Sequence, residues 1–227
     1  MIYCSVDGKE RPIGHRFSPY EFNGGTALGI SGDNFAVVAC DTRLAEGYKI
    51  LSRDVSKAVQ LSSSCVLGTG GCFTDVATLH KVLGMRADEY QHEHDDEISA
   101  PAMAQLLSTT LYYRRFFPYY AFNVLAGLDA EGKGAVYTYD AVGSFERVGY
   151  ACQGAGQKLI IPLLDNLVGW KHRPAPKPQM SVGDAVELAK EAFVTAGERD
   201  IYTGDAIEIF VIEASGITRQ TFELKKD

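Results

Sequence analysis

The chain has 227 residues, of which 46% are hydrophobic and 22% charged, a composition that fits one large globular domain. Its net charge of −7, with no run of Lys or Arg, argues against nucleic acid or an anionic membrane as a partner. No apolar run reaches the roughly 18 residues of a membrane span, and the amino terminus lacks the basic start and apolar core of a signal peptide.

The cysteines indicate a reducing compartment. Their number is odd, they form no C-x-x-C motif, and three of them lie in apolar surroundings, so we expect buried free thiols. The neighbouring histidines His92 and His94 lie in a charged run that is most simply a solvated helix end. We therefore expect no metal and no cofactor. The five cysteines are Cys4, Cys40, Cys65, Cys72 and Cys152.

Residues 1–24 form an amino-terminal extension that allows two interpretations. Glycines, prolines and charged residues favour a flexible leader, whereas Phe17, Tyr20 and Phe22 favour a propeptide or an arm that docks on a neighbour, because exposed aromatic clusters usually mark contacts. Both interpretations remain open for residues 1–14, and docking is favoured for residues 16–23. The main domain is expected to span residues 25–227.

Two apolar runs, over residues 23–30 and 35–43, are separated by a turn at residues 31–34 that contains Gly32-Asp33-Asn34, and they predict a β-hairpin. The second arm is too apolar to alternate, so we expect a strand that is buried on both faces. It ends in Asp41 and Arg43, charges that a buried strand tolerates only when they are paired. Lys57 opens another short strand, over residues 58–61.

The next elements are a strand, a glycine-rich turn and two helices. Residues 65–71 predict a strand that ends in glycines, without the Gly-Lys-Ser/Thr or G-x-G-x-x-G spacing of a phosphate loop. A helix follows, with apolar residues at spacings of three and four from Cys72 to Tyr90. Ser99 caps the second helix, which carries Pro101 in its first turn.

The second half repeats this order. Strands are predicted over residues 122–128 and 135–139, and a turn at residues 140–144 leads into a strand over residues 145–152. Gly154-Ala155-Gly156 opens a third helix, and Ser181, with Asp184 three residues on, caps a fourth. Two last strands follow. The order of strands, two helices, strands, two helices and strands predicts an α+β fold, a four-layer αββα sandwich with a helix pair outside each sheet.

Several segments resemble the β subunits of the eukaryotic 20S proteasome, which are N-terminal-nucleophile hydrolases. The resemblance extends over nearly the whole chain from Arg16 on, and it is strongest to the non-catalytic β6 type. Several such segments in one order are a strong signal, unlike any single short motif. They are Arg16-Phe17-Ser18-Pro19-Tyr20, Phe22-Asn23-Gly24-Gly25-Thr26, Asp41-Thr42-Arg43, Arg114 to Tyr120, Gly127-Leu128-Asp129, Gly132 to Tyr137 and Arg199 to Asp205.

The resemblance implies a vestigial active site. Active members carry a threonine nucleophile that is freed by peptide cleavage, so that one residue supplies both hydroxyl and amine. Aligning Asp41 and Lys57 without gaps puts Gly25 at the nucleophile position, and glycine has no hydroxyl. The other carried-over positions are Ala155, where active members have a serine, and Asp200 and Thr203. No catalytic residue is then expected, and a buried Asp41–Lys57 ion pair explains why these charges persist.

Two alternatives remain. An active threonine protease subunit would use Thr26, which follows a literal Gly-Thr bond. Because Thr26 is one residue out of step with Asp41 and Lys57, its hydroxyl is expected to point away from Lys57. The other alternative is a free cytosolic enzyme of a bacterial-type β fold, which Gly25 and Ala155 disfavour.

The resemblance also implies partners and a location. We expect contacts with other proteasome β and α subunits in stacked rings, and activity in the cytoplasm and nucleus. In the family, the β6 type walls part of a neighbouring substrate pocket, which carries over to the turn at residues 140–144 with Asp140 facing the cleft. The alternative is that Asp140 only closes this turn, a common use of Asp.

Overall fold

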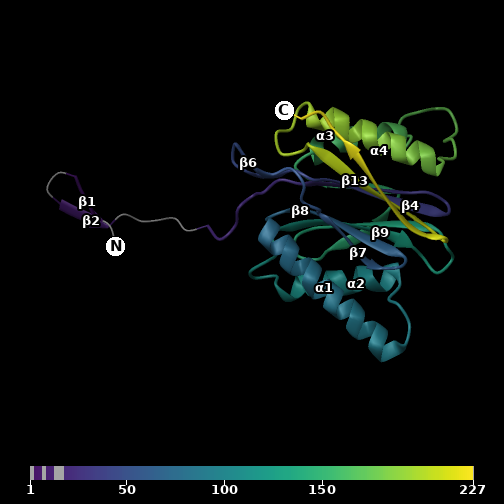
Figure 1. The fold of residues 1–227 in the computed structure, drawn as a ribbon, viewed down its shortest axis with the longest axis horizontal. Helices are drawn as coiled ribbons and strands as arrows, with labels where there is room; N and C mark the ends of the chain where they lie inside the picture. The colour runs from purple at the N-terminus through teal and green to yellow at the C-terminus, as the bar shows by residue number, and fades with distance from the viewer. Residues whose placement is uncertain (1–2, 7–8, 13–17, 227) are drawn as a thin grey trace.

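Two five-stranded antiparallel sheets pack face to face, and a pair of helices covers the outer face of each (Figure 1). This computed structural model describes residues 3–6, 9–12 and 18–226, of which 3–6 and 9–12 are described by backbone only. The four layers are the predicted αββα sandwich. Within the described residues, no helix combines the length and the apolar character that are needed to cross a membrane.

The first sheet carries the predicted hairpin at its centre. Apolar side chains from its outer face form one core cluster with helices α3 (Gln157–Leu167) and α4 (Val182–Gly197). Every residue of the hairpin's second arm is buried, as predicted for a strand covered on both faces. In spatial order the strands are β12 (Tyr150–Gly154), β3 (Thr26–Ser31), β4 (Phe35–Asp41), β13 (Ala206–Glu213) and β14 (Gly216–Glu223).

The second sheet is covered by helices α1 (Phe73–His94) and α2 (Ala100–Tyr113), which contribute to a separate core cluster. Between the two sheets, a third cluster consists mainly of small or β-branched residues such as Ala27, Val38, Val124 and Ala126. Their small size lets the sheets approach closely. In spatial order the strands are β11 (Phe145–Val148), β10 (Gly134–Tyr139), β9 (Ala121–Leu128), β8 (Cys65–Gly71) and β7 (Ala58–Ser62).

The predicted helix caps are confirmed. The Ser99 hydroxyl accepts a hydrogen bond from the N–H of Ala102 at 3.4 Å. Ser181 and Asp184 form a reciprocal capping box at the start of α4, which satisfies two backbone N–H groups that the helix itself leaves unpaired.

The prediction of one strand over residues 145–152 is wrong. The chain bends at Gly149, so that β11 pairs with β10 in one sheet while β12 pairs with β3 in the other. Apolar residues occur on both sides of the bend, because Phe145 and Val148 of β11 are partly buried against the core and Ala151 and Cys152 of β12 are buried. A glycine within a strand pattern marks such a bend, a signal that was available in the sequence.

Two small hairpins were not predicted. Strands β5 (Leu44–Glu46) and β6 (Lys49–Ser52) pair with each other, as do β1 (Tyr3–Val6) and β2 (Lys9–Pro12) in the amino-terminal extension. The backbone of the latter pair is therefore strand where a leader or arm was expected. Arg16 and Phe17, at the start of the favoured docking segment, lie outside the described residues.

The described part of the docking segment packs on its own chain. The ring of Tyr20 lies 5.6 Å from that of Phe117 and 5.4 Å from that of Tyr120, measured between centroids. The Tyr20 hydroxyl donates to the carbonyl of Pro118 at 2.8 Å, and Phe22 packs edge-on against Tyr202. Docking on a neighbouring chain stays a prediction, because no partner chain is present.

Candidate functional site

An ion pair occupies the end of β4. The Lys57 Nζ lies 3.0 Å from Asp41 Oδ2 and 3.1 Å from the Asp41 carbonyl oxygen, and it also donates to the carbonyl of Arg43. Both side chains are buried, with 4% of Lys57 and none of Asp41 exposed. Burial raises the pKa of the Asp41 carboxyl, and the Lys57 ammonium and the N–H of Thr26 act against that rise.

Gly25 faces this pair. A Cβ built on Gly25 would lie 2.8 Å from Lys57 Cδ, so a side chain at this position would point at the lysine. The backbone on either side is held, because Gly71 N–H donates to the carbonyl of Gly24 at 2.9 Å and Ala155 N–H to that of Gly25 at 3.0 Å. Gly25 offers no hydroxyl, and a peptide bond to Gly24 occupies the place of an amine.

The Thr26 hydroxyl is used in another direction. Its Oγ1 accepts from the N–H of Gly156 at 2.8 Å and lies 2.7 Å from Thr203 Oγ1. Thr203 in turn donates to Asp200 Oδ2 at 2.6 Å. Because the Thr203 proton points to the carboxylate, Thr26 must be the donor to Thr203. The Thr26 hydroxyl therefore accepts a hydrogen bond from Gly156 and donates one to Thr203, and neither hydrogen bond goes to Lys57.

The structure thus brings together the residues that the resemblance assigns to the vestigial active site, which are Gly25, Asp41, Lys57, Ala155, Asp200 and Thr203. The N–H of Thr26 donates to Asp41 Oδ1 at 2.7 Å and links the ion pair to the hydroxyl chain. Ala155 contributes its backbone N–H to Gly25 but has no side-chain hydroxyl. Their interpretation as a vestigial active site stays a prediction, since geometry alone does not test the role of each residue.

A small cavity adjoins this group. A cavity lined by Lys57, Thr69, Gly70 and Phe73 has a volume of about 10 Å3, whereas ligand pockets usually have several hundred. The backbones of Gly25 and Gly70 lie against each other beside this cavity, because a Cβ at Gly70 would lie 2.5 Å from the carbonyl oxygen of Gly25. This cavity is therefore too small for a peptide side chain.

A second buried ion pair was missed from the sequence. Arg43 Nε lies 2.9 Å from Asp205 Oδ2, and Arg53 also donates to Asp205. Burial raises the pKa of Asp205, but hydrogen bonds from the two guanidinium groups outweigh it, so the pKa lies below its usual value. The requirement that Arg43 be paired was available from the sequence, but nothing in the pattern identified Asp205 as the partner.

A neutral network beside the group was also missed. The Thr69 hydroxyl donates to Asn123 Oδ1 at 3.1 Å and lies 2.9 Å from His80 Nε2. Because the threonine proton points to Asn123, His80 must carry its own proton on Nε2. Burial lowers the pKa of His80 to about 4, so the ring is neutral near pH 7.

Asp140 closes its turn as the alternative interpretation expects. Its Oδ1 accepts from the N–H of Val142 at 3.0 Å and from that of Ser144 at 2.8 Å. The residue is exposed. Closing the turn does not prevent Asp140 from facing a neighbour, and that role is not tested by a single chain.

Metal-ligating side chains do not gather in the part of the chain that the structure describes. Those residues contain no group of three or more His, Cys, Asp or Glu side chains that could hold an ion. Cys40, Cys65, Cys72 and Cys152 are buried and free, and the side chain of Cys4 lies outside the described residues. Burial raises the pKa of Cys40, Cys65 and Cys152, which makes these thiols unreactive.

Comparison with known proteins identifies relatives along nearly the whole chain. The family model described as "Proteasome subunit" matches residues 21–212. The protein called "Proteasome subunit beta type-1" in Petunia hybrida is 52% identical over 93% of this chain and 97% of the relative. Proteins of the same name are 54% identical in Oryza sativa subsp. japonica, over 92% and 96%, and 46% identical in Drosophila melanogaster, over 98% and 94%.

Proposed function

The chain belongs to the proteasome subunit family, and from this premise we propose that it is a non-catalytic β-ring subunit of the 20S core particle. It contributes to ATP- and ubiquitin-dependent protein degradation by completing the closed proteolytic chamber. Its partners are other proteasome β and α subunits in stacked rings, and its location is the cytoplasm and nucleus.

Gly25 is the observation that carries the non-catalytic role. A side chain at this position would face Lys57, and glycine has no hydroxyl to activate. The neighbouring Thr26 cannot substitute without losing its contacts to Gly156 and Thr203. The retained Asp41–Lys57 pair is consistent with a structural role, because removing one partner of a buried pair costs about 3–5 kcal/mol.

A covalent probe tests the proposal directly. A threonine-directed proteasome inhibitor, given to the assembled particle, should label other β chains and leave this chain unmodified in an intact-mass measurement. The same measurement shows whether the amino terminus of the assembled chain is Met1, Arg16 or Thr26. An adduct on Thr26 would overturn the proposal in favour of an active threonine protease subunit.

Gel filtration tests the remaining alternative. A ring subunit should elute with a particle of many chains, whereas a free cytosolic enzyme of a bacterial-type β fold should elute by itself. Elution of the native chain outside any particle would contradict the structural role.

The turn at residues 140–144 is proposed to wall a substrate pocket of the neighbouring β5 subunit. The support is its exposed Asp140, which accepts turn hydrogen bonds through Oδ1 and leaves Oδ2 available. A charged hydrogen bond from a substrate group is worth about 1.5–3 kcal/mol. Asp140→Ala should therefore weaken inhibitors that carry a hydrogen-bond donor two residues from the cut, by about tenfold or more at the chymotrypsin-like site. Equal inhibition of mutant and parent would reduce Asp140 to a turn residue.

A further inference from the structure

Asn23 lies where three elements meet. Its backbone N–H donates to the carbonyl of Gly71 at 3.1 Å, and its backbone carbonyl accepts from the N–H of Ala45 at 3.2 Å. Its side-chain Nδ2 donates to the carbonyl of Ala45 at 3.1 Å, and its Oδ1 accepts from the N–H of Phe73 at 3.0 Å. Asn23 therefore connects β5, the end of β8 and the start of α1 through its backbone and through both ends of its side-chain amide.

The hydrogen bond to Phe73 completes the amino terminus of α1. The N-cap residue of this helix, Cys72, makes no side-chain capping hydrogen bond, and the first N–H groups of a helix need acceptors from outside the helix. Asn23 supplies one of these acceptors from a position 50 residues earlier in the chain. The cap of α1 thereby also fixes the segment that carries Asn23.

The preceding residues of this segment have an aromatic surface that matches them. The ring of Tyr20 lies against those of Phe117 and Tyr120. The ring of Phe22 packs edge-on against those of Tyr120 and Tyr202. Because aromatic rings attract one another in specific geometries, these contacts select an aromatic side chain at two positions of the segment.

Gly24 is recognised by its conformation. Its φ is +81°, and a Cβ at this position would lie 2.9 Å from Cβ of Tyr202, so only glycine fits without strain. Its carbonyl accepts from the N–H of Gly71 at 2.9 Å. Backbone hydrogen bonds combined with selective side-chain contacts are typical of a bound peptide.

The segment also closes the space beneath it. Asn23 and Gly24 are among the residues that line the cavity of about 10 Å3 beside Lys57. Without these two residues the cavity would be open on that side, and the N–H groups of Ala45 and Gly71 would lose their acceptors. Backbone N–H groups away from water need a partner, so this place in the fold requires an occupant.

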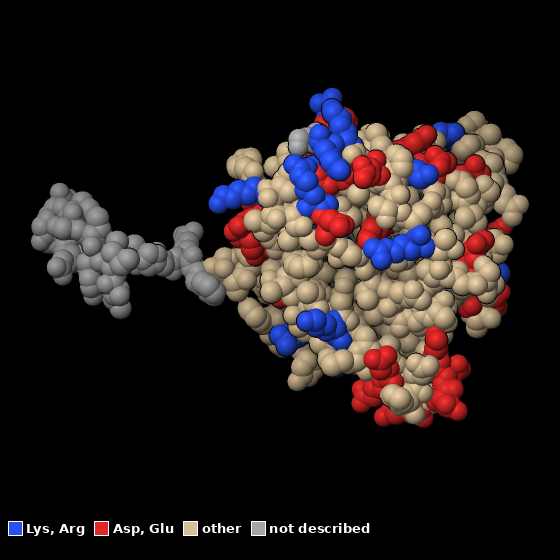
Figure 2. Space-filling model, in the orientation of Figure 1, with Lys and Arg blue, Asp and Glu red and all other residues tan. Residues whose placement is uncertain are grey.

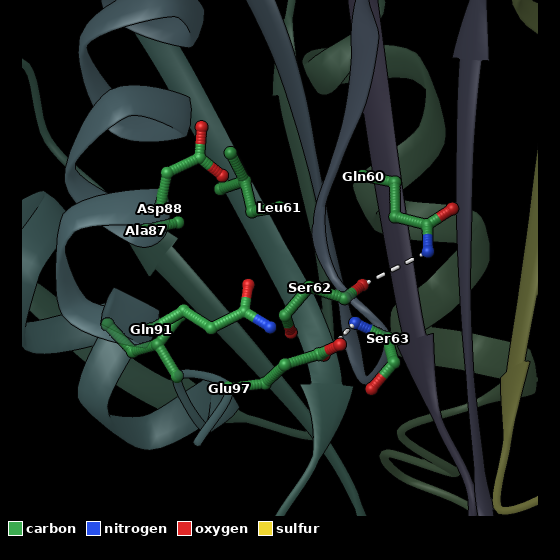
Figure 3. Close-up of a pocket in the computed structure, with 9 residues that line it drawn as sticks. Gln60, Leu61, Ser62, Ser63, Ala87, Asp88, Gln91 and Glu97 are labelled. Atoms are coloured by element: carbon green, nitrogen blue, oxygen red, sulfur yellow. Dashed lines mark hydrogen bonds between the residues drawn. The ribbon is translucent and has the colours of Figure 1, made fainter. Parts of the chain in front are cut away.

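A larger hollow at the end of α1 is built differently. It has a volume of about 420 Å3, and exposed polar side chains such as Gln60, Asp88 and Gln91 line it (Figure 3). Figure 2 shows acidic side chains gathered at this end of the molecule. Exposed side chains lose rotamer freedom when they bind a ligand, whereas the backbone groups around Asn23 are already held in strands and a helix. The preorganised peptide site is therefore at Asn23.

We propose that the junction of β5, β8 and α1 is a peptide-binding site and that residues 20–24 of the chain itself are its ligand, clasped by Asn23. The ligand is a peptide with two aromatic residues, followed by Asn-Gly. Because the segment is tethered through Gly25, its effective concentration at the site is roughly millimolar, which excludes free peptides. The inference rests on the proposed function, because a chain that walls a proteolytic chamber meets peptide fragments there.

A photoreactive peptide tests the site in assembled particles whose active subunits are blocked with a threonine-directed inhibitor. The probe is the heptapeptide of residues 18–24, with benzoyl-phenylalanine at the position of Phe22. The parent chain should not capture it. Asn23→Ala removes two side-chain hydrogen bonds from the tethered segment and should raise capture by about tenfold. The attachment point should lie in a peptide that contains Tyr120 or Tyr202.

Two further variants separate the clasp from the stability of α1. Asn23→Asp keeps an acceptor for the N–H of Phe73, at a helix start that favours negative charge, but it lacks the donor to Ala45. It should raise capture by about threefold and keep a melting temperature close to that of the parent. Phe22→Ala leaves Asn23 and the α1 cap in place and should also raise capture. The exposed Asn34 provides the control, since Asn34→Ala should leave capture unchanged.

A second probe tests whether the site recognises the peptide sequence. The same heptapeptide with Ala in place of its Asn should be captured about tenfold less by Phe22→Ala. Equal capture of the two probes would overturn the inference, as would equal capture by the parent and by Asn23→Ala, or attachment at the hollow near the end of α1. A lower melting temperature of Asn23→Ala without any capture would reduce Asn23 to a structural cap.

The two proposals fail in different ways. If the unmodified chain does not enter a proteasome particle at all, the proposed function is wrong. If it enters the particle and the incorporated variants capture no probe, only the inference of a peptide site is wrong.

Discussion

The two sheets each have a buried polar network beside Gly25, and the networks differ in charge. At the end of β4, Asp41 pairs with Lys57, and Arg43 pairs with Asp205. On the β8 side, the neutral hydroxyl of Thr69 connects His80 with Asn123. The networks adjoin, because the N–H of Thr69 donates to the carbonyl of Lys57 at 3.0 Å.

The difference in charge gives a structural reason for the chain to keep Asp41 and Lys57. A buried charge that loses its partner is far more costly than a neutral group that loses a hydrogen bond. Asp41 and Lys57 are therefore expected to be constrained by folding even where no chemistry depends on them. Variants in the two networks should then differ in the size and pH dependence of their effects.

Lys57→Ala should have the largest effect. It leaves the buried Asp41 carboxylate without its ammonium partner, at a cost of about 3–5 kcal/mol. We expect poor incorporation and a lower melting temperature of the particle, with the active sites of other subunits chemically unchanged. The exposed Lys49 provides the control, since Lys49→Ala should change stability by less than about 0.5 kcal/mol. Normal incorporation of Lys57→Ala would rule out a costly buried pair.

Gly25→Thr should destabilise the chain without creating peptidase activity. The new Cβ would lie 2.8 Å from Lys57 Cδ, on a backbone with φ of +91°, and strained backbone alone costs about 1–3 kcal/mol. Ala155 still lacks a hydroxyl, and the bond to Gly24 must also be cut. The measurement is peptidase activity of particles that contain the variant, compared with the parent.

A matched substitution separates backbone strain from steric clash at Gly25. Gly47 also has positive φ, +57°, but nothing lies within 4 Å of a Cβ there. Gly25→Ala should therefore lower the melting temperature more than Gly47→Ala.

For Gly25→Thr, new peptidase activity that disappears when the new threonine is removed would show that the missing hydroxyl is the only obstacle to activity.

Thr26→Val should cost about 1–3 kcal/mol, because it leaves the N–H of Gly156 without its buried acceptor and removes the donor to Thr203, which keeps only its hydrogen bond to Asp200. Thr26→Ser keeps the hydroxyl and should retain most of the stability. Thermal unfolding of particles containing each variant measures the difference. Equal stability of the valine and serine variants would show that the hydroxyl chain contributes nothing.

The neutral network should respond to pH with a smaller effect. The folded pKa of His80 is about 4, below its ordinary value of 6.5. Its stabilising contribution is therefore complete above pH 6.5 and is lost as the pH falls towards 4. Between pH 7 and pH 5 we expect a loss of about 1–2 kcal/mol, which His80→Gln should remove. An unchanged pH dependence of melting in His80→Gln would show that His80 does not titrate on unfolding.

The sequence by itself determined the layers and most elements. Apolar periodicity located the four helices, the capping residues Ser99 and Ser181 located two helix starts, and the apolar run at residues 35–40 indicated a strand covered on both faces. These features depend on neighbours in the chain, which is why they can be read locally. The resemblance to proteasome β subunits, aligned without gaps at Asp41 and Lys57, placed Gly25 at the nucleophile position, and in the structure a Cβ at Gly25 would face Lys57.

Only the tertiary structure decided the partners. Asp205 lies 162 residues from Arg43, Thr203 lies 177 residues from Thr26, and Asn123 lies 54 residues from Thr69. Each of these contacts depends on sheet order and register, which bring distant strands and turns together, and local periodicity carries no information about either. The division of residues 145–154 between two sheets was decided in the same way, because both halves contain apolar residues and only the packing of the two sheets determines which sheet each half joins.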